Sequence, residues 1–250
     1  MVSVSPAEGT EPPLEMRGRE DPWLAKRIER KYRVDPARLG LARAWLDHAC
    51  RPAPDYPTGV VTSCYYDTPD LASYYESSDG MWGKTKVRLR WYDAVLGSEM
   101  QPAFLELKSR QGLESSKRRV AVEVDTEQLR AGDFEAVLGP AQLRSVLAEM
   151  GYATPFGLRP TALIQYERRR FVERQSGMRV SLDFAIRASG LWPGAGPEAT
   201  LEWAVLELKG TDGPLPMRLK ALPRLALPWS AHSKYGTSIE ELGIPSRDWD

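Results

Sequence analysis

The segment KTKVRLRWY, residues 84–92, alternates basic and apolar side chains with a period of two. This is the period of a β-strand, in which successive side chains point to opposite faces of the sheet. One face would carry Lys84, Lys86, Arg88 and Arg90, and the other Thr85, Val87, Leu89 and Trp91. We therefore predict a strand with an apolar face to be covered and a strongly basic face.

The same alternation recurs in other segments, whose polar faces hold Glu106, Lys108 and Arg110; Lys117 and Arg119; Tyr166, Arg168 and Arg170; Arg179, Ser181 and Asp183; and Glu207 and Lys209. For any one strand, a solvated outer face is the simplest interpretation. Six strands dominated by Lys and Arg favour instead a closed barrel with a charged inside and an apolar outside covered by helices. Buried cations need anions or water to neutralise them. Such a barrel would bind a chain of phosphates.

One domain is expected, spanning residues 23–245, after a disordered segment at 1–22 that is rich in Pro, Glu, Gly and Ser. The sequence echoes itself once, as FLELKS at residues 104–109 and VLELKG at residues 205–210. The expected strands are Lys26–Val34, Val60–Asp67, Lys84–Tyr92, Ala103–Arg110, Ser116–Val124, Thr161–Glu173, Met178–Arg187 and Leu201–Lys209. The expected helices follow Asp35-Pro36 to about His48 and cover Glu127–Val137, Ala141–Met150 and Pro216–Leu222.

The overall composition excludes several classes of protein. Lys plus Arg and Asp plus Glu both number 34, so bulk charge gives no argument for nucleic acid or for an anionic membrane. Two cysteines and two histidines are too few for a disulfide framework or a His-based metal site. The sequence shows no secretion signal and no membrane-spanning segment, so we expect a cytoplasmic protein.

Four acidic residues of the polar faces are candidate metal ligands. Glu207, Glu106, Glu29 and Asp183 offer hard oxygen donors, which suit Mg²⁺ or Mn²⁺ better than zinc. Mg²⁺ commonly binds a few carboxylates together with substrate phosphates. The alternative is that these acids form salt bridges with neighbouring Lys and Arg side chains.

These segments together resemble the vacuolar transporter chaperone (VTC) domain, the polyphosphate polymerase branch of the triphosphate tunnel metalloenzymes, or CYTH-like superfamily. The matching segments, in order from residue 26 to 240, are ERKYRV (29–34), TSCYYDTPDL with the following YY (62–75), KVRLRWY (86–92), LELKSR (105–110), SSKRRV (115–120), YERRRF (166–171), MRVSLD (178–183), AVLELK (204–209) and HSKYG (232–236). The resemblance implies an eight-stranded antiparallel tunnel with helices packed outside, a fold of the α+β, mainly β class.

The resemblance also implies roles for individual residues. Six cations would take part in catalysis: Lys31, Arg88, Arg90, Lys108, Arg168 and Lys234. Further phosphate contacts would come from Lys117, Tyr166, Arg179, Lys209 and Ser233. Glu207 falls at the family's metal-binding glutamate, and we add Glu106 and Glu29 as candidates. Hydrolytic members of the superfamily carry Glu-x-Glu-x-Lys on the first strand, whereas Arg27 replaces the first glutamate here. This departure favours the polymerase branch.

The expected activity is transfer of the ATP γ-phosphate onto a growing inorganic polyphosphate chain, assisted by Mn²⁺ or Mg²⁺. The polyphosphate end is itself the acceptor, so no protein nucleophile is needed. Two alternatives stay open: hydrolysis of inorganic or nucleoside triphosphate, and non-catalytic binding of polyphosphate or inositol pyrophosphate. RNA binding is disfavoured because the short basic runs divide between two faces of a strand. The sequence leaves open whether a protein partner is needed.

Overall fold

The computed structural model describes residues 27–93, 99–112, 114–154, 157–211, 213–220, 222 and 233–243. The side chains of residues 27, 28, 114, 115 and 211 are not described. The expected disordered segment at 1–22 and both ends of the expected domain lie outside the described residues. No helix in the described parts of the chain is long and apolar enough to cross a membrane.

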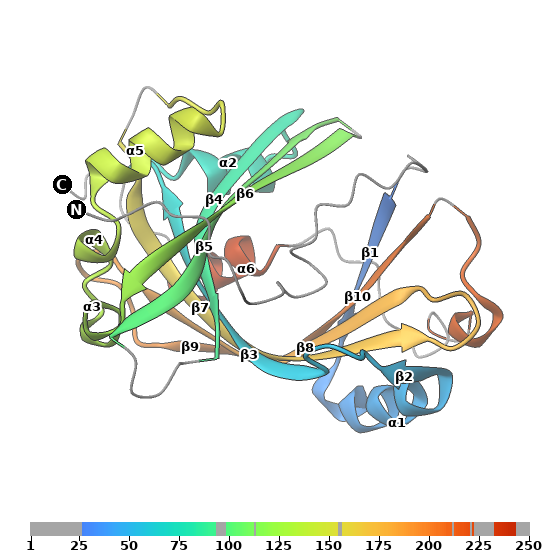
Figure 1. Cartoon of the computed structure of the whole chain (residues 1–250). Helices are drawn as coiled ribbons and strands as arrows, with labels where there is room; N and C mark the ends of the chain where they lie inside the picture. The colour runs from blue at the N-terminus through green and yellow to red at the C-terminus, as the bar shows by residue number, and fades with distance from the viewer. Residues whose placement is uncertain are drawn as a thin grey trace.

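The described chain is one antiparallel sheet with helices on both faces (Figure 1). Its strands are β1 (Arg27–Val34), β2 (Cys50–Pro52), β3 (Thr58–Asp67), β4 (Gly83–Tyr92), β5 (Met100–Gln111), β6 (Glu114–Asp125), β7 (Arg159–Glu173), β8 (Arg179–Gly190), β9 (Ala199–Leu201) and β10 (Ala204–Thr211). The helices are η1 (Pro36–Arg38), α1 (Leu39–Ala49), α2 (Ala72–Ser78), α3 (Thr126–Ala131), α4 (Phe134–Val137), α5 (Pro140–Glu149), η2 (Met217–Leu219) and α6 (Lys234–Glu241).

Eight strands follow one another through the sheet in the order β1-β10-β8-β7-β3-β4-β5-β6. The short strands β2 and β9 pair with β7 and β8 outside this path. The antiparallel sheet expected from the sequence is therefore confirmed. Its closure is not, because β1 and β6, the two ends of the path, are not paired with each other in the described residues.

The outer face of the sheet is apolar and covered by helices, as the alternation of the strands predicts. Over β4–β6, residues such as Leu89 and Leu105 pack against α4 and α5. Over β8 and β10, residues such as Leu182 and Leu206 pack against α1 and η2. Each strand presents these residues on the face opposite its charged side chains, so the charged set lines the inner, concave face.

Helix α6 departs from the expectation that helices lie only outside the sheet. It packs against the concave face, between the part of the sheet formed by β4–β6 and the part formed by β1 and β10 (Figure 1). Tyr235, Ile239 and Leu242 share a cluster there with Val61, Ile164 and other residues of β3, β7 and β8. An amphipathic helix must bury its apolar side, and these apolar residues of β3, β7 and β8 cover that side of α6. The inner face is therefore part apolar and part charged.

Two further differences have local causes. The helix expected over Glu127–Val137 is divided into α3 and α4 because Gly132 adopts a left-handed conformation, with φ +74°, and Asp133 caps a new helix at Ala136 N. The helix expected over Pro216–Leu222 is only the short 3₁₀ turn η2.

Candidate functional site

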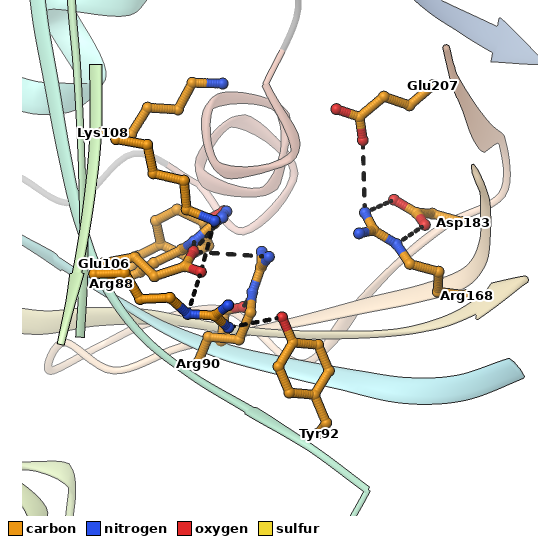
Figure 2. A network of polar contacts seen from close by, with 12 residues as sticks. Arg88, Arg90, Tyr92, Glu106, Lys108, Arg168, Asp183 and Glu207 are labelled. Atoms are coloured by element: carbon orange, nitrogen blue, oxygen red, sulfur yellow. Dashed lines mark hydrogen bonds and ion pairs between the residues drawn. The ribbon is translucent and has the colours of Figure 1, made fainter. Parts of the chain in front are cut away.

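Charged side chains from two walls of the sheet face each other across the concave face (Figure 2). One wall consists of β4, β5 and β6, and the other of β1, β10, β8 and β7. Arg88, Arg90 and Glu106 lie on the first wall, whereas Arg168 and Asp183 lie on the second. The strand alternation alone places all of these on one face, and the curvature of the sheet turns the two walls toward each other.

Glu106 is the centre of the first wall. Its side chain is only 1% exposed, and four cations approach it. Arg88 Nη2 lies 2.6 Å from Oε2, Lys117 Nζ lies 2.8 Å from Oε1, and Arg119 and Arg90 lie at 3.3 and 3.7 Å. Burial opposes ionisation, but the charges of Arg88, Arg90 and Lys117 outweigh it and hold the pKa of Glu106 well below its usual range.

Neighbouring hydroxyl groups orient the two arginines of this wall. Arg90 donates from Nε to Ser63 Oγ at 3.1 Å and from Nη2 to the Tyr166 hydroxyl at 3.4 Å. Arg88 donates from Nη1 to the Tyr65 hydroxyl at 3.0 Å. Burial would raise the pKa of Tyr65, but the charges of Arg88 and Arg90 lower it to about 7. Both guanidinium groups are therefore held in place before any ligand binds.

Asp183 organises the opposite wall. Arg168 donates to it through two nitrogens, at 2.6 and 2.9 Å, and Lys234 Nζ lies 2.6 Å from Oδ2. Asp183 is fully buried. Burial would raise its pKa, but Arg168 and Lys234 hold the pKa well below its usual range. The contact also fixes the first residue of α6 to the sheet.

The residue after Lys234 is held by a second buried acid. The Tyr235 hydroxyl donates to Asp67 Oδ2 at 2.6 Å, and its ring stacks on Tyr65 with centroids 4.9 Å apart. Asp67 also accepts backbone hydrogen bonds from Ser73 and Tyr74 at the start of α2. Two consecutive residues of α6 are thus tied to the concave face by two carboxylates.

The edge strand β1 supplies a looser group of charges. Glu29 lies 3.4 Å from Lys31 on its own strand, 3.9 Å from Lys209 on β10 and 3.2 Å from Lys108 on β5. The Lys108 contact reaches from one wall to the other. Burial would raise the pKa of Glu29, but these lysines lower it to about 2. Glu207 is 7% exposed at its side chain, and its nearest cations are more distant, Arg168 at 3.6 Å and Lys209 at 3.9 Å.

Most residues predicted from the sequence therefore meet on the concave face. Two are placed differently from the rest. Arg179 is exposed and lies opposite Lys209 in the β8–β10 pairing. Ser233 uses its hydroxyl oxygen to cap α6, accepting from Gly236 N at 3.0 Å. Its hydroxyl hydrogen could still be donated to a phosphate oxygen.

Sequence reasoning did not assign site roles to Arg119, Tyr65 or Asp67. Arg119 could have been predicted as a site residue, because it lies two residues after Lys117 and therefore on the same face of the strand. Its guanidinium donates to the Tyr92 hydroxyl at 3.1 Å and lies over the Phe104 ring, 3.8 Å from its centroid. Tyr65 and Asp67 lie in a β-branched and aromatic strand whose pattern does not distinguish a site residue from a core residue.

The four predicted metal ligands differ in how well they fit a divalent ion. Asp183 is occupied by Arg168 and Lys234, each at 2.6 Å, which favours a role in ion pairing. Glu106 is already enclosed by cations, which favours a role in ion pairing. Glu207 and Glu29 flank the same Lys209 ammonium, each at 3.9 Å. One or two carboxylates joined by substrate phosphates match the usual Mg²⁺ donor set. Among the described residues no group of three or more His, Cys, Asp or Glu side chains could hold a metal by itself. These residues thus fit a metal that arrives with phosphate.

Comparison with known proteins gives one family match. The model of the VTC domain matches residues 26–242. No curated protein gives a significant match. Solved structures that match include a "putative adenylate cyclase" from Bacillus halodurans, at 16% identity and TM-score 0.44, covering 74% of this chain and 80% of that one. Another "putative adenylate cyclase", from Vibrio parahaemolyticus, matches at 16% identity and TM-score 0.39, covering 86% and 97%.

Proposed function

The chain belongs to the VTC domain family, and from this premise we propose that it transfers the γ-phosphate of ATP onto the end of an inorganic polyphosphate chain. The observation that carries the proposal is the charge of the concave face. Its ion pairs in the described residues join nine cations to four carboxylates: Lys31, Arg88, Arg90, Lys108, Lys117, Arg119, Arg168, Lys209 and Lys234 to Glu29, Glu106, Asp183 and Glu207. A polyanion would compensate this excess of positive charge.

The cations of the concave face can bind the phosphates and stabilise the charge of the transition state. Arg88 and Arg90 are already oriented by Glu106, Ser63 and Tyr166, so they can bind phosphate oxygens with little reorganisation. Phosphoryl transfer passes through a loose transition state with charge spread over the oxygens, which fixed cations stabilise. Holding two anionic reactants between opposed cationic walls also removes much of their mutual repulsion.

Glu207, with Glu29 beside it, would hold a divalent ion that binds together with the phosphates. Such an ion would supply positive charge that stabilises the negative charge of the phosphates. The ion would be Mn²⁺ or Mg²⁺, both of which prefer carboxylate and phosphate oxygens. We also propose that the two walls enclose the phosphates as the family's eight-stranded tunnel, and that the protein works in the cytoplasm, with ATP as phosphate donor.

Two related functions would use the same cations. With water as acceptor the protein would be a triphosphatase. Arg27 stands where the hydrolytic relatives carry a first glutamate, and this favours transfer over hydrolysis. Without turnover the protein would be a binding module for polyphosphate or inositol pyrophosphate. The Glu207 carboxylate, held less closely by cations than Glu106, favours a metal-dependent reaction over simple binding.

The test is to incubate the purified protein with ATP and Mn²⁺, separate the products on a gel and stain for polyphosphate. Chains that grow with time, and that Arg90→Ala and Lys234→Ala abolish, support the proposal. Lys220→Ala is the matched control, since Lys220 is exposed beside η2 on the outer side of the sheet. Orthophosphate without chains would establish the triphosphatase. Full activity in both inner variants would contradict the assignment of the site.

A further inference from the structure

The cations of β4, β5 and β6 form a ladder of rows that continues beyond the residues considered so far. Arg88, Glu106 and Arg119 lie side by side across the three strands. The next row, two residues along each strand, consists of Lys86, Lys108 and Lys117. A third row pairs Lys84 with Arg110. A strand rises about 3.3 Å per residue, so successive rows are about 7 Å apart.

The lysine row, residues 86, 108 and 117, places like charges directly opposite each other on adjacent strands. Such pairs destabilise a sheet. Lys117 and Lys108 are compensated by Glu106 and Glu29. In the described residues no carboxylate forms an ion pair with Lys86 or Lys84. The fold therefore tolerates a run of partly buried positive charge that it does not neutralise itself.

The surroundings of Lys86 show that this charge is unfavourable without a ligand. Lys86 is half-buried, and burial lowers its pKa to about 8, helped by the positive charges of Lys108, Lys84 and Arg88. The negative potential of Tyr65 opposes this shift. An exposed lysine on an ordinary solvated face would not experience this environment. The succession of rows runs along the strands toward the turn between β5 and β6, since the next row pairs Lys84 with Arg110 near the end of β5.

We propose that Lys86 and Lys84 form an outer subsite for the distal phosphates of a linear polyphosphate, continuing from the Arg88 row toward the β5–β6 hairpin. This inference rests on the proposed function. It adds the direction in which the phosphate chain runs along the concave face and a preference for longer chains. A triphosphate is short enough to be held by Arg88, Arg90 and the cations of the opposite wall. Only a longer chain reaches the outer subsite, so affinity increases with chain length.

The test is direct binding of two probes, inorganic triphosphate and a long linear polyphosphate, measured by calorimetry at one ionic strength. The variant is Lys84→Gln/Lys86→Gln. The control, Arg218→Gln/Lys220→Gln, removes the same charge from exposed positions in and beside η2, on the outer side of the sheet. Hydrogen bonds to charged groups, each worth a factor of about ten or more, predict a loss of about tenfold or more for the long chain. The loss for triphosphate should stay within about twofold, and the control should bind both probes as the wild type does.

Equal losses for both probes, or no loss for either, would overturn the outer subsite while leaving the proposed function intact. Equal losses in the control and inner variants would likewise overturn it, because the effect would then be one of net charge. If the wild type binds neither probe, the proposed function fails, and the outer subsite fails with it.

Discussion

Replacing Asp183 by Asn tests whether the buried acids organise the cations of the concave face. The substitution keeps the shape of the side chain but removes its charge, leaving Arg168 and Lys234 without their shared partner at 2.6 Å. Breaking a buried ion pair by removing one member costs about 3–5 kcal/mol. Asp183 is 0% exposed, so the estimate needs no reduction for solvent screening. For a chain of this length the melting temperature should fall by about 6–20 °C.

The assay is urea unfolding followed by tryptophan fluorescence, with Asp47→Asn as control. Asp47 pairs with Arg169 at 3.1 Å, but its side chain is 52% exposed, so its loss should cost less than about 1 kcal/mol. If Asp183→Asn also costs less than about 1 kcal/mol, the reasoning is refuted.

The stability lost in Asp183→Asn should depend on pH in a specific way. The folded pKa of Asp183 is depressed, so its contribution to stability is complete above the unfolded value of about 3.9 and is lost as the pH falls toward the folded value. The stability difference between wild type and Asp183→Asn should therefore be constant near neutral pH and shrink below about pH 4. A difference that stays constant down to pH 2 would show that the lost contact is not electrostatic.

Three other predictions follow from the same contacts. Tyr235→Phe removes the 2.6 Å hydrogen bond to buried Asp67 and should lower the free energy of unfolding by about 1–3 kcal/mol; urea unfolding measures this, and an unchanged midpoint would contradict it. The pKa of Lys117, lowered to about 8 chiefly by burial, means that its positive charge is lost as the pH rises through 8. The affinity for long polyphosphate, measured by calorimetry, should fall between pH 7 and 9 in the wild type and fall less in Lys117→Arg, since arginine stays charged. Part of the fall should remain, because burial also lowers the pKa values of Lys31 and Lys86 to about 8; parallel profiles would exclude Lys117 as a cause. Glu207→Gln should weaken Mn²⁺ binding measured in the presence of triphosphate by about tenfold or more, whereas Glu106→Gln should leave it near the wild-type value; the reverse order would assign the metal to Glu106.

The strands could be predicted because their signal is local. Residues 84–92 alternate so regularly that strand, inner face and outer face all follow from a period of two, and β4 spans Gly83–Tyr92 as expected. The position of α6 could not be predicted in this way. Ser233 is a usual helix cap, but nothing in the sequence near Lys234 reveals that Asp183 and Asp67, far away in the chain, hold the helix inside the sheet.

The candidate site shows the same division between local and long-range information. Alternation placed Glu106 on the basic face, but the four cations around it depend on the register of three strands, in which Glu106 lies between Arg88 and Arg119. A carboxylate on such a face can be a metal ligand or a counter-ion. The choice depends on distances across the sheet, which no single segment encodes.

Within the described residues β1 and β6 are not paired with each other, and this has a consequence for how a polymer would leave the protein. A sheet closed on itself forces a growing chain to thread out by one end, which favours processive synthesis. In the described residues, an ion pair between Lys108 on β5 and Glu29 on β1 joins the two walls where the ends of the sheet face each other. Their side chains are 43% and 31% exposed. Such an exposed pair contributes at most about 1 kcal/mol, so it is easily opened. Opening this pair would let a polyphosphate leave the proposed tunnel sideways in mid-chain, so its release would not require the whole chain to thread out by one end.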